Sequence, residues 1–352
     1  MRKRRHIRIS SFEFQVSILE FEPERSGARR SQIWNLKFGI SLLAVRLTIL
    51  FFVFHNSYFV NAQQDPIFTQ YMYTKLEFNP AYAGSRDALA VDMLTRFQWV
   101  GVEGAPRTIC LTAHTPLRNP HIGLGFYMYR DALGPTVDYN VMASFAYRIL
   151  FPTSKLAFGV SAGIKYYNID WNLLHPKDPG DQLLVNDASN RVVPDVDFGI
   201  YYSHSRYYAG ISVKHLLQNQ LVVSSTSPNN EVNFTRLRAS FYGIAGGSVP
   251  LADKFMFLPS LLVKYVDNAP LQVDLNARFL LFDILTLGVG YRTSNAIGLL
   301  VGVDVGKGFS VGYSYDIWFN ALRSHNSGSH EIRISFETDL FKRTRMLTPR
   351  YF

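Results

Sequence analysis

Apolar and polar residues alternate along this chain from Leu89 almost to its C-terminus. A period of two places alternate residues on opposite faces of a strand. In residues 138–149 one parity is apolar and comprises Tyr139, Val141, Ala143, Phe145, Tyr147 and Ile149. The other parity contains mostly polar residues, including Asp138, Asn140, Ser144 and Arg148. The alternation predicts strands with one face in an apolar medium and one face toward polar surroundings.

The alternation predicts an all-β fold, an antiparallel transmembrane β-barrel of about 14 strands. The expected strands are 89–100, 106–116, 121–130, 138–149, 155–168, 195–204, 206–214, 236–249, 254–266, 270–280, 284–293, 296–305, 308–317 and 329–339. An even number of strands in a chain of this size is typical of bacterial outer-membrane barrels.

The connections between the expected strands alternate in length. The long ones, 169–194, 215–235 and 318–328, all follow odd-numbered strands, whereas those after even-numbered strands are short. Outer-membrane barrels have short periplasmic turns and longer outer loops. The sequence therefore predicts that both mature termini lie in the periplasm.

A water-soluble β-sandwich or barrel is the alternative, because it is also built of alternating strands. Two features favour the membrane. Many strands pair a large apolar parity with a parity of Gly, Ser and charged residues. Aromatic residues near strand ends are expected to form interfacial girdles, namely Tyr127, Tyr129, Trp171, Tyr265, Tyr291 and Trp318.

Composition agrees with a barrel and removes a nucleic-acid function. Aromatic residues make up 14% of the chain and charged residues 18%, below the roughly 25% of soluble domains. The formal charge is +9, but residues 1–62 hold 10 Lys/Arg and 4 Asp/Glu, which leaves 26 against 23 in the remainder. Since most of the basic excess lies in a segment expected to be removed, no nucleic-acid partner is predicted.

The N-terminal region resembles an export segment. Residues 38–60 are mostly apolar, basic residues precede them, and Ala62 provides a small residue for cleavage. A lasting membrane anchor is the alternative, although Arg46 interrupts the stretch. Because residues 1–30 do not resemble a signal peptide, we expect translation to start downstream, near Leu36.

We therefore divide the chain into four parts. Residues 1–62 are an N-terminal extension and signal peptide, and 63–88 a periplasmic or lumenal lead-in. Residues 89–341 are the outer-membrane barrel, and 342–352 a C-terminal tail.

Charged residues inside the expected barrel must face its lumen, because Arg or Lys facing lipid at the midplane costs roughly 2–4 kcal/mol. The residues concerned are Asp274, Arg278, Arg292, Asp304, Asp316, Arg333 and Glu337. A barrel of fourteen strands is wide enough that wall side chains alone do not fill it. The lead-in is then a candidate plug or a periplasmic docking segment.

Catalytic, cofactor and metal signatures are not found, so no catalytic, cofactor-binding or metal residue is predicted. His330-Glu331 suggests a metal pair, but a strand start at the outer rim is favoured. Asp178, Asp181 and Asp187 lack the compact spacing of a calcium loop, and a solvated acidic loop is favoured. Cys110 is the only cysteine, which excludes an intrachain disulfide and predicts a small buried or lipid-facing side chain.

Several sequence blocks resemble the PorP/SprF family. Those near the start of the mature chain are Asp65-Pro66-Ile67-Phe68-Thr69-Gln70-Tyr71-Met72, Phe78-Asn79-Pro80-Ala81-Tyr82-Ala83-Gly84, and Arg96-x-Gln98-Trp99-x-Gly101-x-x-Gly104-Ala105-Pro106-x-Thr108. Later blocks are Asp131-x-x-Gly134, Asp197-Phe198-Gly199-Ile200-Tyr201-Tyr202, Gly210-Ile211-Ser212 with His215-Leu216, Gly312-Tyr313-Ser314-Tyr315-Asp316 and Gly328-Ser329-His330-Glu331-Ile332.

The resemblance spans about residues 63–341 and departs from the family pattern in the N-terminal extension and at residues 285–288. It implies a non-enzymatic outer-membrane barrel of the type IX secretion and gliding-motility apparatus of Bacteroidota. It further implies periplasmic or outer-membrane secretion components as partners, together with membrane lipid and a secreted surface protein or adhesin. No small-molecule substrate is implied.

The hypothesis for partner docking centres on the aromatic, proline-restrained lead-in. The candidate docking residues are Asp65, Pro66, Phe68, Gln70, Tyr71, Phe78, Asn79, Pro80, Tyr82 and Trp99. Alternatively, the aromatic residues seal the barrel base, and the two roles are compatible. The alternative function for the whole chain is a passive channel for small solutes, which requires an open lumen. A membrane-embedded lipid hydrolase would need a Ser/His pair, for which no motif is found.

Overall fold

The computed structural model describes residues 65–170, 173, 191–224 and 231–340. The expected signal peptide, translation start and C-terminal tail lie outside these residues, as do Trp171 and the acidic residues of the proposed calcium loop. No helix among the described residues has both the length and the apolar character needed to cross a membrane.

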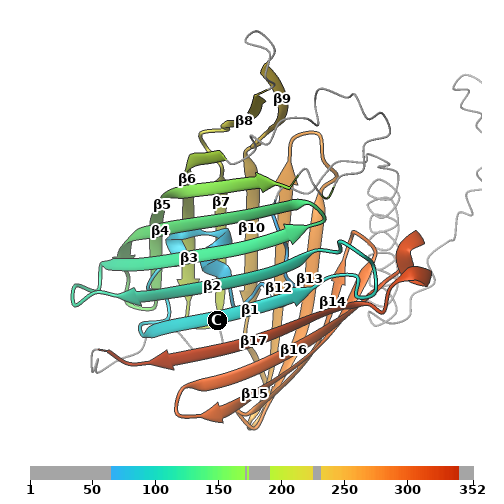
Figure 1. Ribbon diagram of the computed structural model, residues 1–352. Coiled ribbons are helices and arrows are strands. Elements are labelled where there is room, and N and C mark those ends of the chain that lie inside the picture. The colour runs from blue at the N-terminus through green and yellow to red at the C-terminus, as the bar shows by residue number, and fades with distance from the viewer. Residues whose placement is uncertain (1–64, 171–172, 174–190, 225–230, 341–352) are drawn as a thin grey trace, which may run out of the picture. The chain divides into compact units, whose positions relative to one another are not determined.

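Fourteen antiparallel strands form a closed barrel (Figure 1). They are β1 (Leu89–Phe97), β2 (Arg107–Pro116), β3 (Ile122–Leu133), β4 (Thr136–Leu150), β5 (Ser154–Ile169), β6 (Arg191–His204), β7 (Tyr207–Lys214), β10 (Ser240–Gly247), β12 (Phe255–Val266), β13 (Gln272–Leu281), β14 (Leu285–Arg292), β15 (Ala296–Gly306), β16 (Phe309–Trp318) and β17 (Ser329–Thr338). Pairing of β1 with β17 and of β10 with β12 closes the ring and leaves no free edge. The predicted fold class is confirmed.

The structure has two strands where the sequence predicts a single strand over 236–249. They are β10 and the short β11 (Val249–Ala252), which both pair with β12. Between the two pairings lies Pro259 of β12, which pairs with Ala277 of β13 but with no residue of β10 or β11. Proline has no N–H to donate to a ladder, so the break falls where a central proline is tolerated.

A second difference lies in the predicted long connection 215–235. It contains a separate hairpin, β8 (Gln220–Ser224) paired with β9 (Glu231–Arg236), which is not part of the barrel sheet. Figure 1 shows this hairpin beyond the ends of β6 and β7. A two-stranded hairpin gives only a short alternating signal, which the sequence analysis assigned to a loop.

Burial alternates along the strands as the sequence pattern predicts. The apolar parity of β4 faces outward, with Phe145 and Tyr147 about half exposed, while Asn140 and Arg148 of the other parity are buried in the lumen. Of the charges expected in the lumen, Asp274, Arg278, Arg292, Asp316 and Arg333 are buried, Glu337 is partly buried, and Asp304 is exposed at its strand end.

The girdle prediction is wrong for three residues. Tyr127, Tyr129 and Trp318 are buried, and the hydroxyls of the two tyrosines bind lumenal carboxylates. They share the parity of glycine and charged residues on their strands, so they point inward. Tyr265 and Tyr291 are exposed on the outward parity, as a girdle requires.

The two rims differ in the length of their connections. One carries the connections 98–106, 170–190, 215–239 and 319–328, and we call it the long-loop rim. The other carries turns as short as 205–206 and 307–308, and we call it the short-turn rim. The segregation of long and short connections follows the prediction. The part of the 319–328 loop that forms a 3-10 helix is η3 (Ala321–His325).

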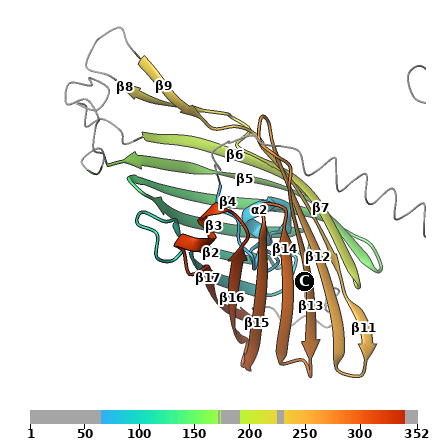
Figure 2. The same ribbon diagram turned by 90° about the vertical axis from the view of Figure 1, so that its right-hand side faces the viewer.

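Residues 65–88 pass through the lumen and form what we call the plug segment. It contains the helical turn α2 (Lys75–Phe78) and the 3-10 turn η1 (Pro80–Tyr82). All of its residues are buried except Pro66, Tyr73 and Asp87, which are partly buried. Figures 1 and 2 show it, in blue, inside the ring of strands.

The plug segment crosses the barrel from one rim toward the other. Asp65 contacts Lys214, the last residue of β7, which lies at the long-loop rim. Asp87 contacts Lys155 near the start of β5, at the short-turn rim, where β17 also ends. The expectation that both mature ends face the periplasm stays untested, because residues 63–64 and 341–352 lie outside the described part.

Candidate functional site: the lumen plug and its anchors

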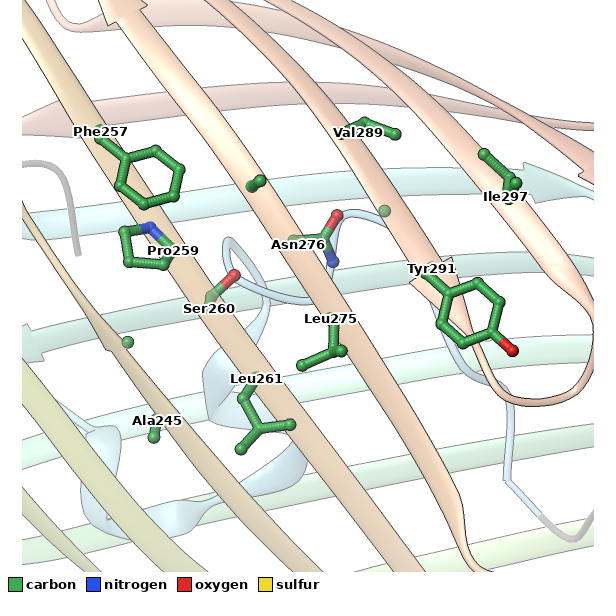
Figure 3. A pocket seen from close by; sticks show the side chains of 13 residues that line it. Ala245, Phe257, Pro259, Ser260, Leu261, Leu275, Asn276, Val289, Tyr291 and Ile297 are labelled. Carbon is green, nitrogen blue, oxygen red and sulfur yellow. The ribbon is translucent and has the colours of Figure 1, made fainter. Parts of the chain in front are cut away.

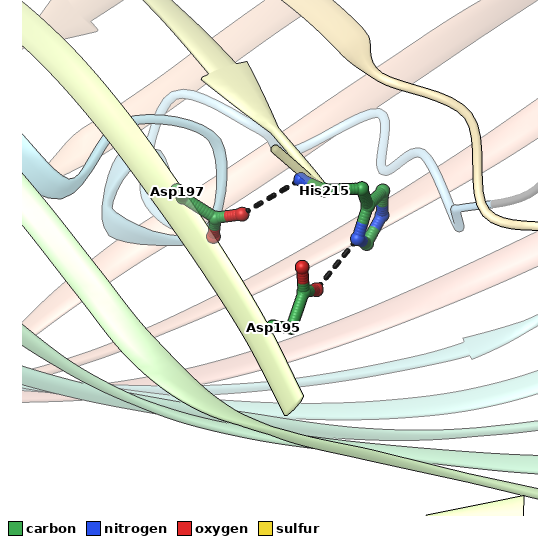
Figure 4. Close-up of side chains that lie close together, drawn as sticks. All are labelled: Asp195, Asp197 and His215. Atoms are coloured by element: carbon green, nitrogen blue, oxygen red, sulfur yellow. Dashed lines mark hydrogen bonds and ion pairs between the residues drawn. The ribbon is translucent and has the colours of Figure 1, made fainter. Parts of the chain in front are cut away.

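The first anchor holds the start of the plug segment against β6 and the end of β7. We call it the Asp65 cluster: Asp65, Asp195, Asp197, Lys214 and His215, all buried. Both Asp65 carboxylate oxygens lie 3.0 Å from Nε2 of His215. Nδ1 of His215 lies 2.6 Å from Asp195, and its backbone N–H donates to Asp197 at 3.1 Å (Figure 4).

Neighbouring polar groups complete the environment of the Asp65 carboxylate. The hydroxyls of Tyr129 and Tyr242 each donate to it at 3.2 Å. The ammonium groups of Lys214 and Lys165 lie 3.9 Å and 4.0 Å away. Since a carboxylate without partners is very costly to bury, these donors explain how an acidic residue is held in the lumen.

The charges of the Asp65 cluster stabilise one another. Burial alone would raise the pKa of Asp65, but His215, Lys214 and Lys165 outweigh it and hold the pKa well below its usual range. Burial alone would lower the pKa of His215, but Asp65 and Asp195 outweigh it and raise the pKa to about 9. At neutral pH the plug segment is therefore attached by an ionised Asp–His pair.

The Asp195, Asp197 and His215 ligand atoms lie within 4.8 Å of one another, a spacing that a metal ion would also use. Here each group already has a partner within the Asp65 cluster, and Lys214 adds a positive charge. The donor set is therefore satisfied by ion pairing, and we assign it an anchoring role rather than a metal-binding one.

The second anchor, the Glu331 cluster, comprises Thr69, Gln70, Arg96, Asp316 and Glu331. The Glu331 carboxylate accepts from the backbone N–H of Thr69 at 2.7 Å and of Gln70 at 3.0 Å. The Thr69 hydroxyl donates to Asp316 at 2.7 Å. Arg96 bridges the two carboxylates, to Asp316 at 2.8 Å and to Glu331 at short range. Two buried acids and one arginine thus fix the plug backbone to β1, β16 and β17.

Cations and aromatic rings pack against the middle of the plug segment. The Arg333 guanidinium lies 3.7 Å from the ring centroid of Tyr73. The Lys75 ammonium lies 4.8 Å from the Tyr82 ring and 4.6 Å from the Tyr208 ring. Cation–π contacts of this kind are strongest where water is excluded, as in this lumen.

The turn at Asn79 fits against wall positions that have no side chain. The Asn79 side chain accepts from the backbone N–H of Ala81 at 2.9 Å and donates to the carbonyl of Ile200 at 3.0 Å. A Cβ on Gly159 would overlap the Ala81 backbone, and a Cβ on Gly199 would overlap the Asn79 side chain. The wall therefore uses glycine where the plug approaches most closely.

The last residues of the plug segment are anchored at the short-turn rim. The backbone N–H of Gly84 donates to Nδ1 of His114 at 3.2 Å, and its carbonyl accepts from Arg148. Asp87 pairs with both Lys155 and Arg148. Anchors at both rims and in the middle leave the plug fixed along its whole length.

Nine of the ten predicted docking residues belong to the plug segment, and the structure places all nine in the lumen. The tenth, Trp99, lies in the β1–β2 loop, partly buried, with its ring 5.6 Å from that of Trp318. Their docking role stays a prediction, and in this closed arrangement the plug residues contact the barrel itself. Cys110 is buried, as predicted, with its sulfur 3.7 Å from Glu77.

Sequence analysis did not single out the wall residues that hold the plug. Asp195 and Lys214 were not assigned any role, Arg148 was noted only for its polar parity, and Asp197 and His215 appeared only as parts of family blocks. Asp316 was expected to face the lumen and Glu331 was considered for a metal pair, but neither was connected with the lead-in. Asp65 and His215 are 150 positions apart, so no local spacing connects them. The sequence did contain one signal for these wall residues: they are polar, most have the inward parity of their strands, and most lie within or next to the family blocks.

A separate apolar pocket of about 490 Å³ lies in the wall formed by β10 and β12–β15 (Figure 3). Its lining is mostly of the outward parity and comprises Ala245, Gly246, Phe257, Pro259, Ser260, Leu261, Leu275, Asn276, Ala277, Val289, Gly290, Tyr291 and Ile297. It contains none of the residues of either plug anchor.

The closed, outwardly apolar barrel with a polar plugged lumen defines an outer-membrane β-barrel protein. The chain belongs to the PorP/SprF family, described as type IX secretion system membrane protein PorP/SprF, whose profile matches residues 60–336. This confirms the family that the sequence blocks indicated.

Comparison with solved structures returns other barrels at low identity. The toluene transporter TodX of Pseudomonas putida shares 10% identity with a TM-score of 0.46, covering 76% of this chain and 93% of TodX. The monoaromatic hydrocarbon channel CymD shares 13% with a TM-score of 0.46, covering 75% and 91%. A porin mutant of Rhodopseudomonas blastica shares 11% with a TM-score of 0.29, covering 71% and 99%. No curated protein matches the chain.

Proposed function

We propose that this protein is a non-enzymatic, occluded barrel of the type IX secretion apparatus. In this proposal it docks periplasmic ring components and helps anchor or export a surface protein. Membership of the PorP/SprF family supports the secretion role. The observation that carries the proposal further is the plug segment, which fills the lumen and is held by residues of the same family blocks.

The plug distinguishes this function from that of a passive channel. A channel needs an open lumen, whereas the anchors at Asp65 and Glu331 fix a buried segment across this one. Breaking a buried ion pair by removing one partner costs about 3–5 kcal/mol, so such anchors are not easily released. The contacts therefore favour a structural and docking role over solute passage.

Because the plug aromatics are enclosed, we assign docking in the closed state to the rims. The short-turn rim presents exposed Arg118 and Arg206 between its strands. The long-loop rim presents the exposed pair Arg238 and Asp267. With short turns in the periplasm, ring components would contact the first rim and a secreted protein the second.

Affinity purification from detergent-extracted outer membranes tests this assignment. The wild type should bring along periplasmic ring components and a surface protein, identified by mass spectrometry. The variant Arg118→Glu/Arg206→Glu should lose the ring components and keep the surface protein. The matched variant Arg238→Glu on the opposite rim should keep the ring components. Recovery of the wild-type barrel alone would contradict the proposal.

A further inference from the structure

Charged side chains are almost excluded from the outward face of this barrel. On the fourteen barrel strands that the structure describes, Arg107 and Arg130 are the only Lys, Arg, Asp or Glu residues on the outward parity. Every other strand residue of these types has the inward parity. An outward charge in a lipid-facing wall is costly at the midplane and tolerated near the interfaces, so its position carries information.

Both arginines lie on adjacent strands at the same height. Arg107 is the first residue of β2, and Arg130 lies three residues before the end of β3, so both are at the long-loop rim. In the β2–β3 register Arg107 faces Ala132, and Ile109 faces Arg130. The two arginines are therefore diagonal neighbours, about 7–8 Å apart between their Cα atoms, which long side chains can bridge.

Tyrosines flank Arg130 on the same outward face. The Arg130 Nε donates to the Tyr139 hydroxyl at 3.1 Å, and its guanidinium carbon lies 5.7 Å from the Tyr139 ring. The Tyr139 ring in turn lies 5.9 Å from that of Tyr166 on β5. The hydrogen bond from Nε of Arg130 to Tyr139 does not use the two terminal nitrogens of the guanidinium group.

We propose that Arg107 and Arg130 bind the phosphate groups of an outer-leaflet lipid, the phosphorylated headgroup of lipopolysaccharide. Arginine matches phosphate through paired N–H donors, and tyrosines are typical of the headgroup level of membrane proteins. The residues below Arg130 on the same face of β3 are Met128, Phe126 and Leu124, which suit acyl chains. At the short-turn rim the described strand residues of the outward parity include His204 but no arginine or lysine, and Arg118 and Arg206 lie in the turns beyond the strands. The outward strand positions therefore favour the leaflet at the long-loop rim.

The proposal rests on the orientation of the barrel in the proposed function, in which the long-loop rim lies at the cell surface. Its readout is lipid binding, which does not depend on secretion partners. Loss of partners in the purification experiment with lipid binding intact would overturn the docking function alone. Unselective binding of inner-leaflet phospholipid would overturn the assignment to lipopolysaccharide alone.

Native mass spectrometry of the purified full chain, titrated with diphosphoryl lipid A in detergent, tests the site. The double variant Arg107→Gln/Arg130→Gln should bind at least tenfold more weakly than the wild type. Arg118→Gln/Arg206→Gln, which removes two arginines from the opposite rim, should bind as the wild type does. With dephosphorylated lipid A, the wild type and the double variant should bind equally.

Three results would overturn the proposal. They are equal binding of diphosphoryl lipid A by the wild type and the double variant, equal loss in the opposite-rim control, and equal preference for phosphatidylglycerol. If the double variant fails to fold, Arg130→Lys serves instead, because it keeps the charge and loses the paired donors. It should bind more weakly than the wild type, and unchanged binding would count against the site.

Discussion

The inward and outward faces of the same strands differ in what they require of the sequence. The outward face is mostly apolar and requires no particular apolar residue at a given position, as the exposed Val289, Leu299 and Val301 illustrate. The inward face carries specific pairs such as Arg96 with Glu331 and Asp65 with His215. The family blocks fall largely on the inward residues and on the plug that they hold. The contrast teaches that the family signature describes attachment of the plug more than it describes the barrel.

The largest effect should follow loss of a buried acid that holds the plug. Glu331→Ala removes the partner of Arg96 and leaves the N–H groups of Thr69 and Gln70 unpaired in the lumen. We expect a loss of about 3–5 kcal/mol in the free energy of unfolding, measured by denaturant titration in lipid vesicles. Ile332→Ala, one residue along but facing lipid, should lose much less. Similar losses in the two variants would contradict the contrast between the faces.

A charge placed on the outward face should act according to depth. Val301→Arg in the middle of β15 should cost about 2–4 kcal/mol of folding free energy in vesicles. Val305→Arg, on the same face of the same strand but at its end, should cost about 0–1 kcal/mol. Equal costs at the two sites would show that this face is not lipid-facing as we describe it.

A smaller effect is expected where the plug meets a wall glycine. Gly159→Ala places a Cβ against the Ala81 backbone and should cost about 1–3 kcal/mol, seen as a lower melting temperature and faster proteolysis of residues 65–88. Gly243→Ala is the control, because its Cβ would meet its nearest neighbour at an ordinary 3.8 Å. A plug that resists proteolysis equally in both variants would contradict the packing.

The smallest effect should be a pH dependence at the Asp65 cluster. The pKa of His215 is raised to about 9, from an unfolded value of about 6.5, so its contribution is complete below about pH 6.5 and lost as pH rises through about 9. The melting temperature of His215→Gln should therefore lie furthest below that of the wild type near pH 6 and approach it near pH 10. If the difference in melting temperature stays constant across that range, the ion pair of His215 does not stabilise the protein as we describe.

The alternation predicted the barrel because a period of two is a property of each strand by itself. The plug contacts could not be predicted in this way, since they join residues far apart, such as Thr69 and Asp316. Tyr127 and Tyr129 were assigned to a girdle because tyrosine suits both an interface and a polar lumen. Their parity, shared with Gly125 and Asp131 on β3, was the available signal for the lumen.

The docking hypothesis illustrates the same limit. Aromatic residues and prolines in an irregular lead-in suit either partner contact or lumen filling, and their sequence is the same in both cases. Burial of Phe68 and Phe78 depends on a ring of strands that closes around them. Local sequence carries no record of that closure, so the two roles could not be separated before the fold was known.

Conductance in a planar lipid bilayer tests the central claim, that the plug segment closes the lumen. The wild type should show no steady conductance, and deletion of residues 65–84 should open a stable pore in a barrel that still assembles. Arg96→Ala/Glu331→Ala, which loosens one anchor, should give intermittent openings. Steady conductance of the wild type equal to that of the deletion variant would contradict the account.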